Sequence, residues 1–158
     1  MEQINRLKCL STWKLFFLSI ITLGIYTAHY ARQQSKIIDE LDHDLPAIGQ
    51  TYVSLLFWLS CISATTAVLS IIDDTNLGLT MVDSLLSLSV NILMLVWAFK
   101  ARNRINQALG AMPKNWYWFH GFWTFLFSPL YINYKINSVS EGFEAEQDQE
   151  SENHTQSF

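Results

Sequence analysis

The sequence predicts an all-α integral membrane protein built on a central two-helix transmembrane hairpin. Only 15% of the 158 residues are charged, whereas a soluble domain carries about 25%. Hydrophobic residues make up 50% of the chain, and they gather in four apolar segments, at about residues 15–31, 52–72, 77–99 and 116–134. These segments place a single membrane domain at residues 1–140.

The two central segments form the hairpin. Residues 52–72 contain no charged side chain, and about 20 apolar residues are enough to cross a bilayer as a helix. After a short link that begins with Asp73 and Asp74, residues 77–99 are again apolar and are interrupted only by Asp83. Two such segments so close together predict antiparallel helices that are joined at the far side of the membrane.

The distribution of lysine and arginine indicates how the two flanking segments are placed. Short cytoplasmic loops of membrane proteins carry an excess of these bases. If all four segments crossed with the N-terminus inside, six of the ten bases would lie outside. If only the central hairpin crosses, all ten lie on one side, and Asp73 and Asp74 lie on the other. The flanking segments are therefore expected to be re-entrant or interfacial, with full crossing as the alternative.

Each flanking segment contains a residue that interrupts a helix. Gly24 stands in the first segment and Ser128-Pro129 in the last. Proline removes a backbone donor and disfavours helix in the residue before it, while glycine readily adopts turn conformations. Shifting the last segment back by 105 positions sets Pro129 on Gly24 and Tyr131 on Tyr26, which indicates a short internal repeat. Such a breaker either turns a re-entrant segment back or kinks a spanning helix.

Polar side chains follow one face of each central segment. Ser63, Thr66 and Ser70 recur at spacings of three and four residues, and Asp83, Ser87 and Asn91 recur every fourth residue. Such faces hold membrane helices together through hydrogen bonds, or they line a polar path, because an ionisable residue inside a span is commonly functional. Thr80 and Asp83 are also spaced like a helix-capping pair, which would place Asp83 near the outer interface.

Tyrosine and basic residues mark the expected membrane interface, where aromatic rings lie at headgroup level and cations just beyond. The candidate anchors are Tyr26, Tyr30, Arg32, Lys100, Arg102, Arg104, Tyr131, Tyr134 and Lys135. Residues 141–158 hold six of the fourteen acids and no lysine or arginine. A segment so acidic and so poor in apolar residues is expected to be a disordered tail, on the cytoplasmic side.

The sequence contains no arrangement typical of an enzyme or a metal site. Phosphate-binding glycine loops, paired catalytic carboxylates and a serine elbow are absent, and His43 has no second histidine at ligand spacing. The aromatic residues between positions 116 and 134 lack the cationic groove that a stacked nucleic acid requires. We therefore expect no catalytic activity, no cofactor and no nucleic-acid partner.

Two runs of residues carry a family resemblance. Thr22-Leu23-Gly24-Ile25-Tyr26, followed by an aromatic and basic helix, resembles a signature of the small bacterial integral membrane proteins grouped as domain of unknown function 4234. Leu130-Tyr131-Ile132-Asn133-Tyr134-Lys135-Ile136-Asn137 is similar to their second signature, which closes the last apolar segment. The chain departs from the pattern at Ala28-His29-Tyr30, where a tryptophan-rich stretch is expected. The resemblance implies a bacterial inner-membrane location and no defined activity.

Together these features predict a non-enzymatic, multi-pass inner-membrane protein in contact with the lipid bilayer. We expect it to act by forming homo-oligomers or by binding another membrane protein. The alternative is a small transporter or channel in which Asp83 and Asn91 lie near a polar path.

Overall fold

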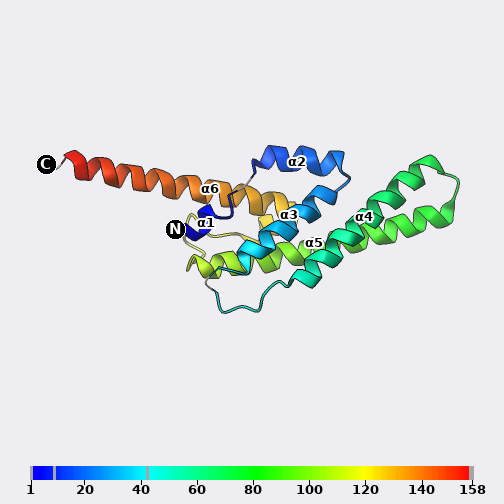
Figure 1. The fold of residues 1–158 in the computed structure, drawn as a ribbon, viewed down its shortest axis with the longest axis horizontal. Helices are drawn as coiled ribbons and strands as arrows, with labels where there is room; N and C mark the ends of the chain where they lie inside the picture. The colour runs from blue at the N-terminus through cyan, green and yellow to red at the C-terminus, as the bar shows by residue number, and fades with distance from the viewer. Residues whose placement is uncertain (1, 9, 42, 157–158) are drawn as a thin grey trace.

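The computed structural model describes residues 2–8, 10–41 and 43–156, and every regular element within these ranges is helical. The helices are α1 (Glu2–Asn5), α2 (Thr12–Ile21), α3 (Ile25–Ile38), α4 (Gln50–Ile72), α5 (Leu77–Ala108) and α6 (Gly121–Gln156). Figure 1 shows α4 and α5 as a long hairpin that projects from a base formed by the other helices and the end of α5. The all-α class is thereby confirmed for the described residues.

Helices α4 and α5 correspond to the two predicted central segments. α4 has 23 residues and α5 has 32, and both are long and apolar enough to cross a membrane. Large apolar side chains on their outer faces are exposed, among them Trp58, Leu85 and Ile92. α5 continues past residue 99 because Ala101 and Ile105 are buried in the core of the base.

Asn76 caps the start of α5. Its Oδ1 accepts a hydrogen bond from the backbone N of Leu79 at 3.1 Å, as the side chain of an N-cap asparagine does. The predicted capping pair of Thr80 and Asp83 is wrong, because Thr80 Oγ1 instead donates to the carbonyl of Asn76. Asp83 lies in the second turn of the helix.

A helix–turn–helix replaces the single segment predicted at residues 15–31. Leu23 and Gly24 have positive φ angles of 50° and 88° at the turn between α2 and α3. Thr27 Oγ1 donates to Ser19 Oγ across this turn at 2.6 Å. The turn points along the long axis of the molecule in the same direction as the loop between α4 and α5 (Figure 1). Gly24 therefore lies at a break, as its position in the sequence predicts.

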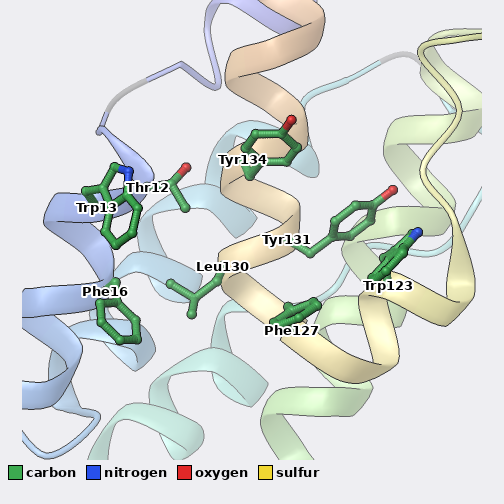
Figure 2. Close-up of a pocket in the computed structure, with 8 residues that line it drawn as sticks. All are labelled: Thr12, Trp13, Phe16, Trp123, Phe127, Leu130, Tyr131 and Tyr134. Atoms are coloured by element: carbon green, nitrogen blue, oxygen red, sulfur yellow. The ribbon is translucent and has the colours of Figure 1, made fainter.

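Helix α6 is interrupted at the second predicted breaker. Ser128 has φ 41° and ψ −118°, immediately before Pro129. Figure 2 shows the chain descending past Trp123 and Phe127 and rising again past Leu130. Residues 110–120 form turns and irregular structure, so the predicted segment 116–134 is helical only from residue 121.

The core lies in the base, where α3 packs against both α4 and α5. Tyr30 and Trp97 are buried there and meet edge to face, with ring centroids 6.2 Å apart. Trp97 Nε1 donates to Ser35 Oγ at 2.8 Å, which supplies the partner that a buried indole N–H needs. These contacts join α3 to the part of α5 that lies in the base.

The structure continues α6 to Gln156, whereas the sequence predicts a disordered tail from residue 141. Phe143 lies against Trp116 and Tyr117, with ring centroids 5.2 and 5.6 Å apart. Lys8 pairs with Glu144 at 3.2 Å. These contacts stabilise the first turns beyond residue 140, and the glutamate and glutamine residues that follow are good helix formers.

Candidate functional site

An open apolar groove of about 520 Å³ lies between α2 and the two halves of α6. It is lined by Thr12, Trp13, Phe16, Trp123, Phe127, Leu130, Tyr131 and Tyr134. In Figure 2, Thr12, Trp13 and Phe16 extend from α2, and the other five side chains extend from the two halves of α6. Well-formed apolar pockets of about 300–1,000 Å³ are the usual binding sites for small apolar ligands, so we take this groove as the candidate site.

The break at Ser128 gives the groove its shape. Trp123 and Phe127 lie one turn apart before the break, and their rings stack at 5.9 Å with an interplanar angle of 18°. Leu130 and Tyr134 lie one turn apart after it. Since a straight helix would carry these two pairs away from each other along its axis, the reversal is what brings both pairs opposite α2.

The surface of the groove is almost entirely apolar. In Figure 2 the indole nitrogen of Trp13 and the hydroxyl groups of Thr12 and Tyr134 lie at the upper end. Phe16 and Phe127 lie at the lower end, near the break in α6. These polar atoms contribute little to the surface of the groove, and Thr12 Oγ1 already accepts a hydrogen bond from Asn133.

Two asparagines without a predicted role hold the groove together. Asn133 Nδ2 and Asn137 Nδ2 both donate to the carbonyl of Leu10 at 2.9 Å. Asn133 Nδ2 also donates to Thr12 Oγ1 at 3.1 Å. Because the two asparagines lie one turn apart on α6, they fix the start of α2 beside it. Their spacing of four residues in a largely apolar helix is a sequence signal that could have indicated this contact.

Asn106 fixes the irregular segment that leads into α6. Its Nδ2 donates to the carbonyl of Phe119 at 3.1 Å, and its Oδ1 accepts from the backbone N of Phe119 at 2.9 Å. Arg102 Nε donates to the same carbonyl at 2.7 Å. The next backbone N, of His120, donates to the hydroxyl of Tyr131 at 2.9 Å. Burial is the main cause that raises the pKa of this tyrosine, which therefore keeps its proton at neutral pH.

The predicted polar faces of the central hairpin meet in part. Thr66 Oγ1 donates to Asp83 Oδ1 at 3.0 Å, and Ser63 and Ser87 share a hydrogen bond of 3.2 Å between their hydroxyl oxygens. These four residues form a polar seam between α4 and α5. Ser70 lies on the same face of α4, and its buried Oγ has no hydrogen-bond partner among the described residues.

Asn91 lies outside this seam. Its side chain is exposed, and its Nδ2 donates to the carbonyl of Ser87 on its own helix at 2.9 Å. A shift of eight residues from Asp83 rotates a position by about 80° around a helix. Asp83 and Asn91 are therefore offset around α5, and a polar path that includes both stays a prediction.

Two of the candidate interface anchors are buried. Tyr30 is 2% exposed and Arg104 is 5% exposed. Arg104 donates to the carbonyls of Lys100 and Pro46 and lies 4.0 Å from a carboxylate oxygen of Asp39. Burial lowers the pKa of Arg104, and the charge of Asp39 opposes that shift. The prediction that Tyr30 and Arg104 contact the membrane interface is wrong, because both join helices inside the base.

The other candidate anchors lie nearer the surface. Three cations lie over aromatic rings: Arg32 over Phe57 at 5.8 Å, Lys100 over Tyr52 at 4.6 Å and Arg102 over Trp118 at 5.5 Å. Tyr26 and Tyr131 are half-buried, and Tyr134 is exposed. Lys135 donates to the carbonyl of Trp116, and burial lowers its pKa. Contact of these residues with lipid stays a prediction.

Metal-binding groups do not assemble in the described part of the chain, where no three His, Cys, Asp or Glu residues lie together as ion ligands. His43 instead contacts the carbonyl of Ile38, at 3.1 Å from its Nε2. Its neighbour Asp42 lies outside the described residues.

Comparison with known proteins identifies one family. The model of the family described as Domain of unknown function (DUF4234) matches residues 10–107. This range runs from the start of α2 to the end of α5 and includes the turn at Gly24. No curated protein and no solved structure matches the chain. Since the match covers more than half of the sequence, the chain belongs to this family.

Proposed function

We propose that this protein is a bacterial inner-membrane protein that acts through self-association of its hairpin. In this proposal α4 and α5 cross the bilayer, and the α2–α3 unit and the broken part of α6 are re-entrant. The function is one of assembly within the membrane, and it involves no catalytic step.

The exposed surface of the hairpin supports its insertion. Trp58, Leu85 and Ile92 are 63%, 66% and 53% exposed. A soluble protein seldom exposes a continuous apolar surface on this scale. In a bilayer the same side chains face lipid hydrocarbon. Moving them from lipid into the protein interior would bring no further hydrophobic free energy.

The charges support one orientation. Lys14 lies in the first turn of α2, Lys36 in the last turn of α3, and Lys100 near the end of α5. These helix ends lie at the base, whereas Asp73 and Asp74 follow the opposite end of α4 (Figure 1). Bases gather on the cytoplasmic side of membrane proteins, so the base and the acidic end of α6 are assigned to the cytoplasm.

The two helix breaks support the re-entrant arrangement. Backbone groups at membrane depth must find partners within the protein. At the first break, Gly24 N donates to the carbonyl of Ser19 at 2.7 Å and Ile25 N to that of Thr22 at 3.1 Å. α3 packs on α4, and α6 packs on α5, so each of the two helices that adjoin a break contacts the hairpin.

Cysteine accessibility in intact cells tests this topology. Both native cysteines, Cys9 and Cys61, are replaced, and single cysteines are placed at Thr75 and Lys36, whose side chains are exposed. Ser35 is unsuitable as a reporter, because it is buried and bonded to Trp97. An impermeant maleimide should label position 75 in intact cells and position 36 only after permeabilisation. Labelling of position 36 in intact cells would mean that the first segment crosses the membrane.

The exposed Asn91 is the observation that carries the proposal of self-association. It lies three residues from residue 88, the midpoint of the apolar stretch 77–99, or about 5 Å along the helix. Its neighbours Leu88 and Ile92 are also exposed. An amide exposed to hydrocarbon is stabilised when a partner helix supplies a hydrogen bond. An asparagine can form that bond with the same residue of a second copy.

The association is measured by energy transfer between labelled chains in vesicles over a range of protein-to-lipid ratios. Asn91→Leu should weaken it about 3- to 30-fold, the range expected for an interhelical hydrogen bond of about 0.6–2 kcal/mol. Ser87→Ala serves as the matched control, because Ser87 bonds to Ser63 within one chain. A monomeric wild type, or an Asn91→Leu variant that associates like the wild type, would refute the proposal.

A further inference from the structure

The hydroxyl group of Thr66 lies between two acceptors in the polar seam of the hairpin. Its Oγ1 is 2.9 Å from the backbone carbonyl oxygen of Ser63 and 3.0 Å from Asp83 Oδ1. A threonine hydroxyl carries one hydrogen, and an ionised carboxylate can only accept. With an ionised Asp83, this hydrogen serves one of the two oxygens at a time, and the other contact has no hydrogen.

A proton on Asp83 completes both contacts. The protonated carboxyl group has an O–H that donates to Thr66 Oγ1. The hydrogen of Thr66 then bonds to the carbonyl oxygen of Ser63, so two hydrogen bonds join the three oxygens in series. The geometry of the seam therefore fits a neutral Asp83.

Asp83 lies within the hydrocarbon core if the hairpin crosses the bilayer as proposed above. It is five residues from residue 88, the midpoint of the apolar stretch 77–99, or about 7.5 Å along the helix. Half of the hydrocarbon core is about 15 Å thick. An ionised side chain at this depth is strongly disfavoured unless an opposite charge pairs with it.

No such charge faces Asp83 from the elements around it. None of the ion pairs in the described part of the chain includes Asp83. Residues 50–72 of α4 carry no charged side chain, and neither do residues 121–134 of α6, which packs on α5. The turn between α2 and α3 shares a pocket with α4, and none of the residues that line it is charged.

The bases of α3 lie nearer the base of the molecule. His29 and Arg32 both pack on Phe57, which lies nine residues before Thr66, or about 13 Å along α4. None of the other titratable side chains within residues 50–72 and 121–134 and the start of α3 is a base. They are Tyr26, Tyr52, Cys61, Tyr131 and Tyr134.

The outer end of the hairpin is the shorter route to Asp83. Asp83 lies six residues from the start of the stretch 77–99 and 16 from its end, or about 9 and 24 Å along the helix. Ser70, one turn from Thr66 toward the outer end, has a buried Oγ with no hydrogen-bond partner among the described residues. In the other direction, Leu56 is fully buried between the helices. A proton would therefore enter from the loop that joins α4 to α5.

We propose that Asp83 is a proton-binding site inside the hairpin, in exchange with the outer side of the membrane. It carries its proton as a neutral carboxylic acid that donates to Thr66. Release of the proton to water breaks the O–H bond of the carboxyl group and leaves a carboxylate. The inference rests on the proposed crossing of the bilayer by α4 and α5, and it adds a ligand site to that arrangement.

Infrared difference spectra of the full chain in phosphatidylcholine vesicles at neutral pH test the proposal. The wild type should show the C=O stretching band of a protonated carboxylic acid, shifted in D2O, and Asp83→Asn should lose it. Asp74→Asn is the matched control. Asp74 is exposed in the outer loop, and a carboxyl group in water is ionised at neutral pH, so this variant should keep the band.

A second pair of variants tests the bond to Thr66 while Asp83 is retained. In Thr66→Val the band should remain and move to higher frequency, because the carboxyl O–H has lost its acceptor. Thr65→Val should leave the frequency unchanged, since Thr65 is exposed and donates to the carbonyl of Cys61 on its own helix. A wild type without a band that depends on Asp83, or an unchanged frequency in Thr66→Val, would overturn the proposal. A band that added sodium removes would assign the site to a metal cation instead.

The direction of access is tested in vesicles whose chains share one orientation, which labelling of Thr75→Cys determines. A rapid rise in pH on the side of position 75 should remove the band, whereas the same rise on the other side should leave it until the pH equilibrates. Loss of the band from the other side only, or from neither side, would overturn the assigned access.

The outcomes separate this inference from the proposed function. If the wild type associates through Asn91 but has no band that depends on Asp83, self-association stands and the proton site is refuted. If the band is present but the wild type is monomeric, the proton site stands and self-association is refuted. If the band is present but position 36 is labelled in intact cells in place of position 75, the proton site stands and the proposed orientation is refuted.

Discussion

Leu23 and Ser128 both have positive φ angles, 50° and 41°, and stand 105 positions apart, each immediately before a helix breaker. Among the described residues they are the two positions other than glycine with this conformation. The likeness extends to side chains, because Ser19 donates to the carbonyl of Leu15 at 2.6 Å and Thr124 to that of His120 at 2.8 Å. Ser19 and Thr124 are 105 positions apart, and so are the two acceptors, Leu15 and His120. The short repeat in the sequence therefore corresponds to a repeated structural break.

The first prediction concerns the turn at Gly24. Gly24 has φ 88°, where a side chain is strained even though no atom lies within 4 Å of an added Cβ. Gly24→Ala should lower the free energy of unfolding by about 1–2 kcal/mol, the cost of a left-handed conformation for a residue with a Cβ. The change is measured by thermal or denaturant unfolding of the purified protein in detergent.

Gly78→Ala is the matched control for that substitution. Gly78 lies in the first turn of α5, and an added Cβ would meet only Asn76 Oδ1, at 3.4 Å. Alanine is a better helix former than glycine by about 1 kcal/mol, so this variant should be as stable as the wild type or more so. Equal stability of the two alanine variants would contradict the assigned turn.

The second prediction concerns the clamp of Asn106 on Phe119. Asn106→Asp keeps the acceptor for the backbone N of Phe119 but places a carboxylate oxygen beside the carbonyl that Nδ2 now contacts. The variant should lose about 2–3 kcal/mol of stability, because a buried donor is lost and a buried charge is introduced. Unfolding in detergent should show this as a drop of several degrees in Tm.

Asn103→Asp provides the comparison for Asn106→Asp. Asn103 is exposed, and its Oδ1 accepts from Arg102 at 3.1 Å, a contact that a carboxylate retains. Its Tm should stay close to that of the wild type. Similar losses in both variants would show that added charge, rather than the clamp, is responsible.

The third prediction concerns the contact of α6 with the irregular segment before it. A Cβ added at Gly142 would lie 2.3 Å from Cη2 of Trp116, so Gly142→Ala must displace the indole. Trypsin should then cleave faster after the exposed Lys114, whose segment is held partly by that ring. Glu141→Ala, at the exposed neighbouring position, should be cleaved at the wild-type rate. If Gly142→Ala is cleaved like Glu141→Ala, residues beyond 140 do not pack as described.

The fourth prediction concerns the pH dependence of stability. Burial lowers the pKa of Lys135 from 10.5. Between that lowered pKa and 10.5, the unfolded chain binds more protons than the folded chain, so the contribution of Lys135 to stability rises with pH. This contribution is complete above the pKa that Lys135 has in the unfolded chain. It is lost as the pH falls through the lower pKa that Lys135 has in the folded protein.

Lys135→Met removes this titration. Its stability relative to the wild type should be highest near neutral pH and should decline as the pH approaches about 10.5. Unfolding of both proteins over that range provides the measurement, and tyrosine ionisation common to both cancels in the difference. A difference that is independent of pH would show that the ammonium group is not disfavoured in the folded protein.

The amino-acid sequence determined the elements whose local signals agree. An uninterrupted apolar stretch predicts α4 almost to its observed ends, since length and hydropathy are properties of the segment itself. Gly24 and Pro129 likewise predict where the chain must break, because backbone restrictions act within one or two residues. The matches at Thr66 with Asp83 and at Ser63 with Ser87 follow from helical periodicity once the two helices are paired.

The tertiary structure decided what each side chain contacts. Tyr30 and Arg104 have the composition of interface anchors, yet they are buried, because α3 packs across α4 and α5 at that height. The acidic segment beyond residue 140 continues a helix because Phe143 meets Trp116, a contact between residues far apart in sequence. The groove likewise depends on a reversal at Ser128 that brings Trp123 and Leu130 opposite Phe16. Local sequence fixes where a helix stops, but only packing determines the direction in which the chain leaves and the surface that it then completes.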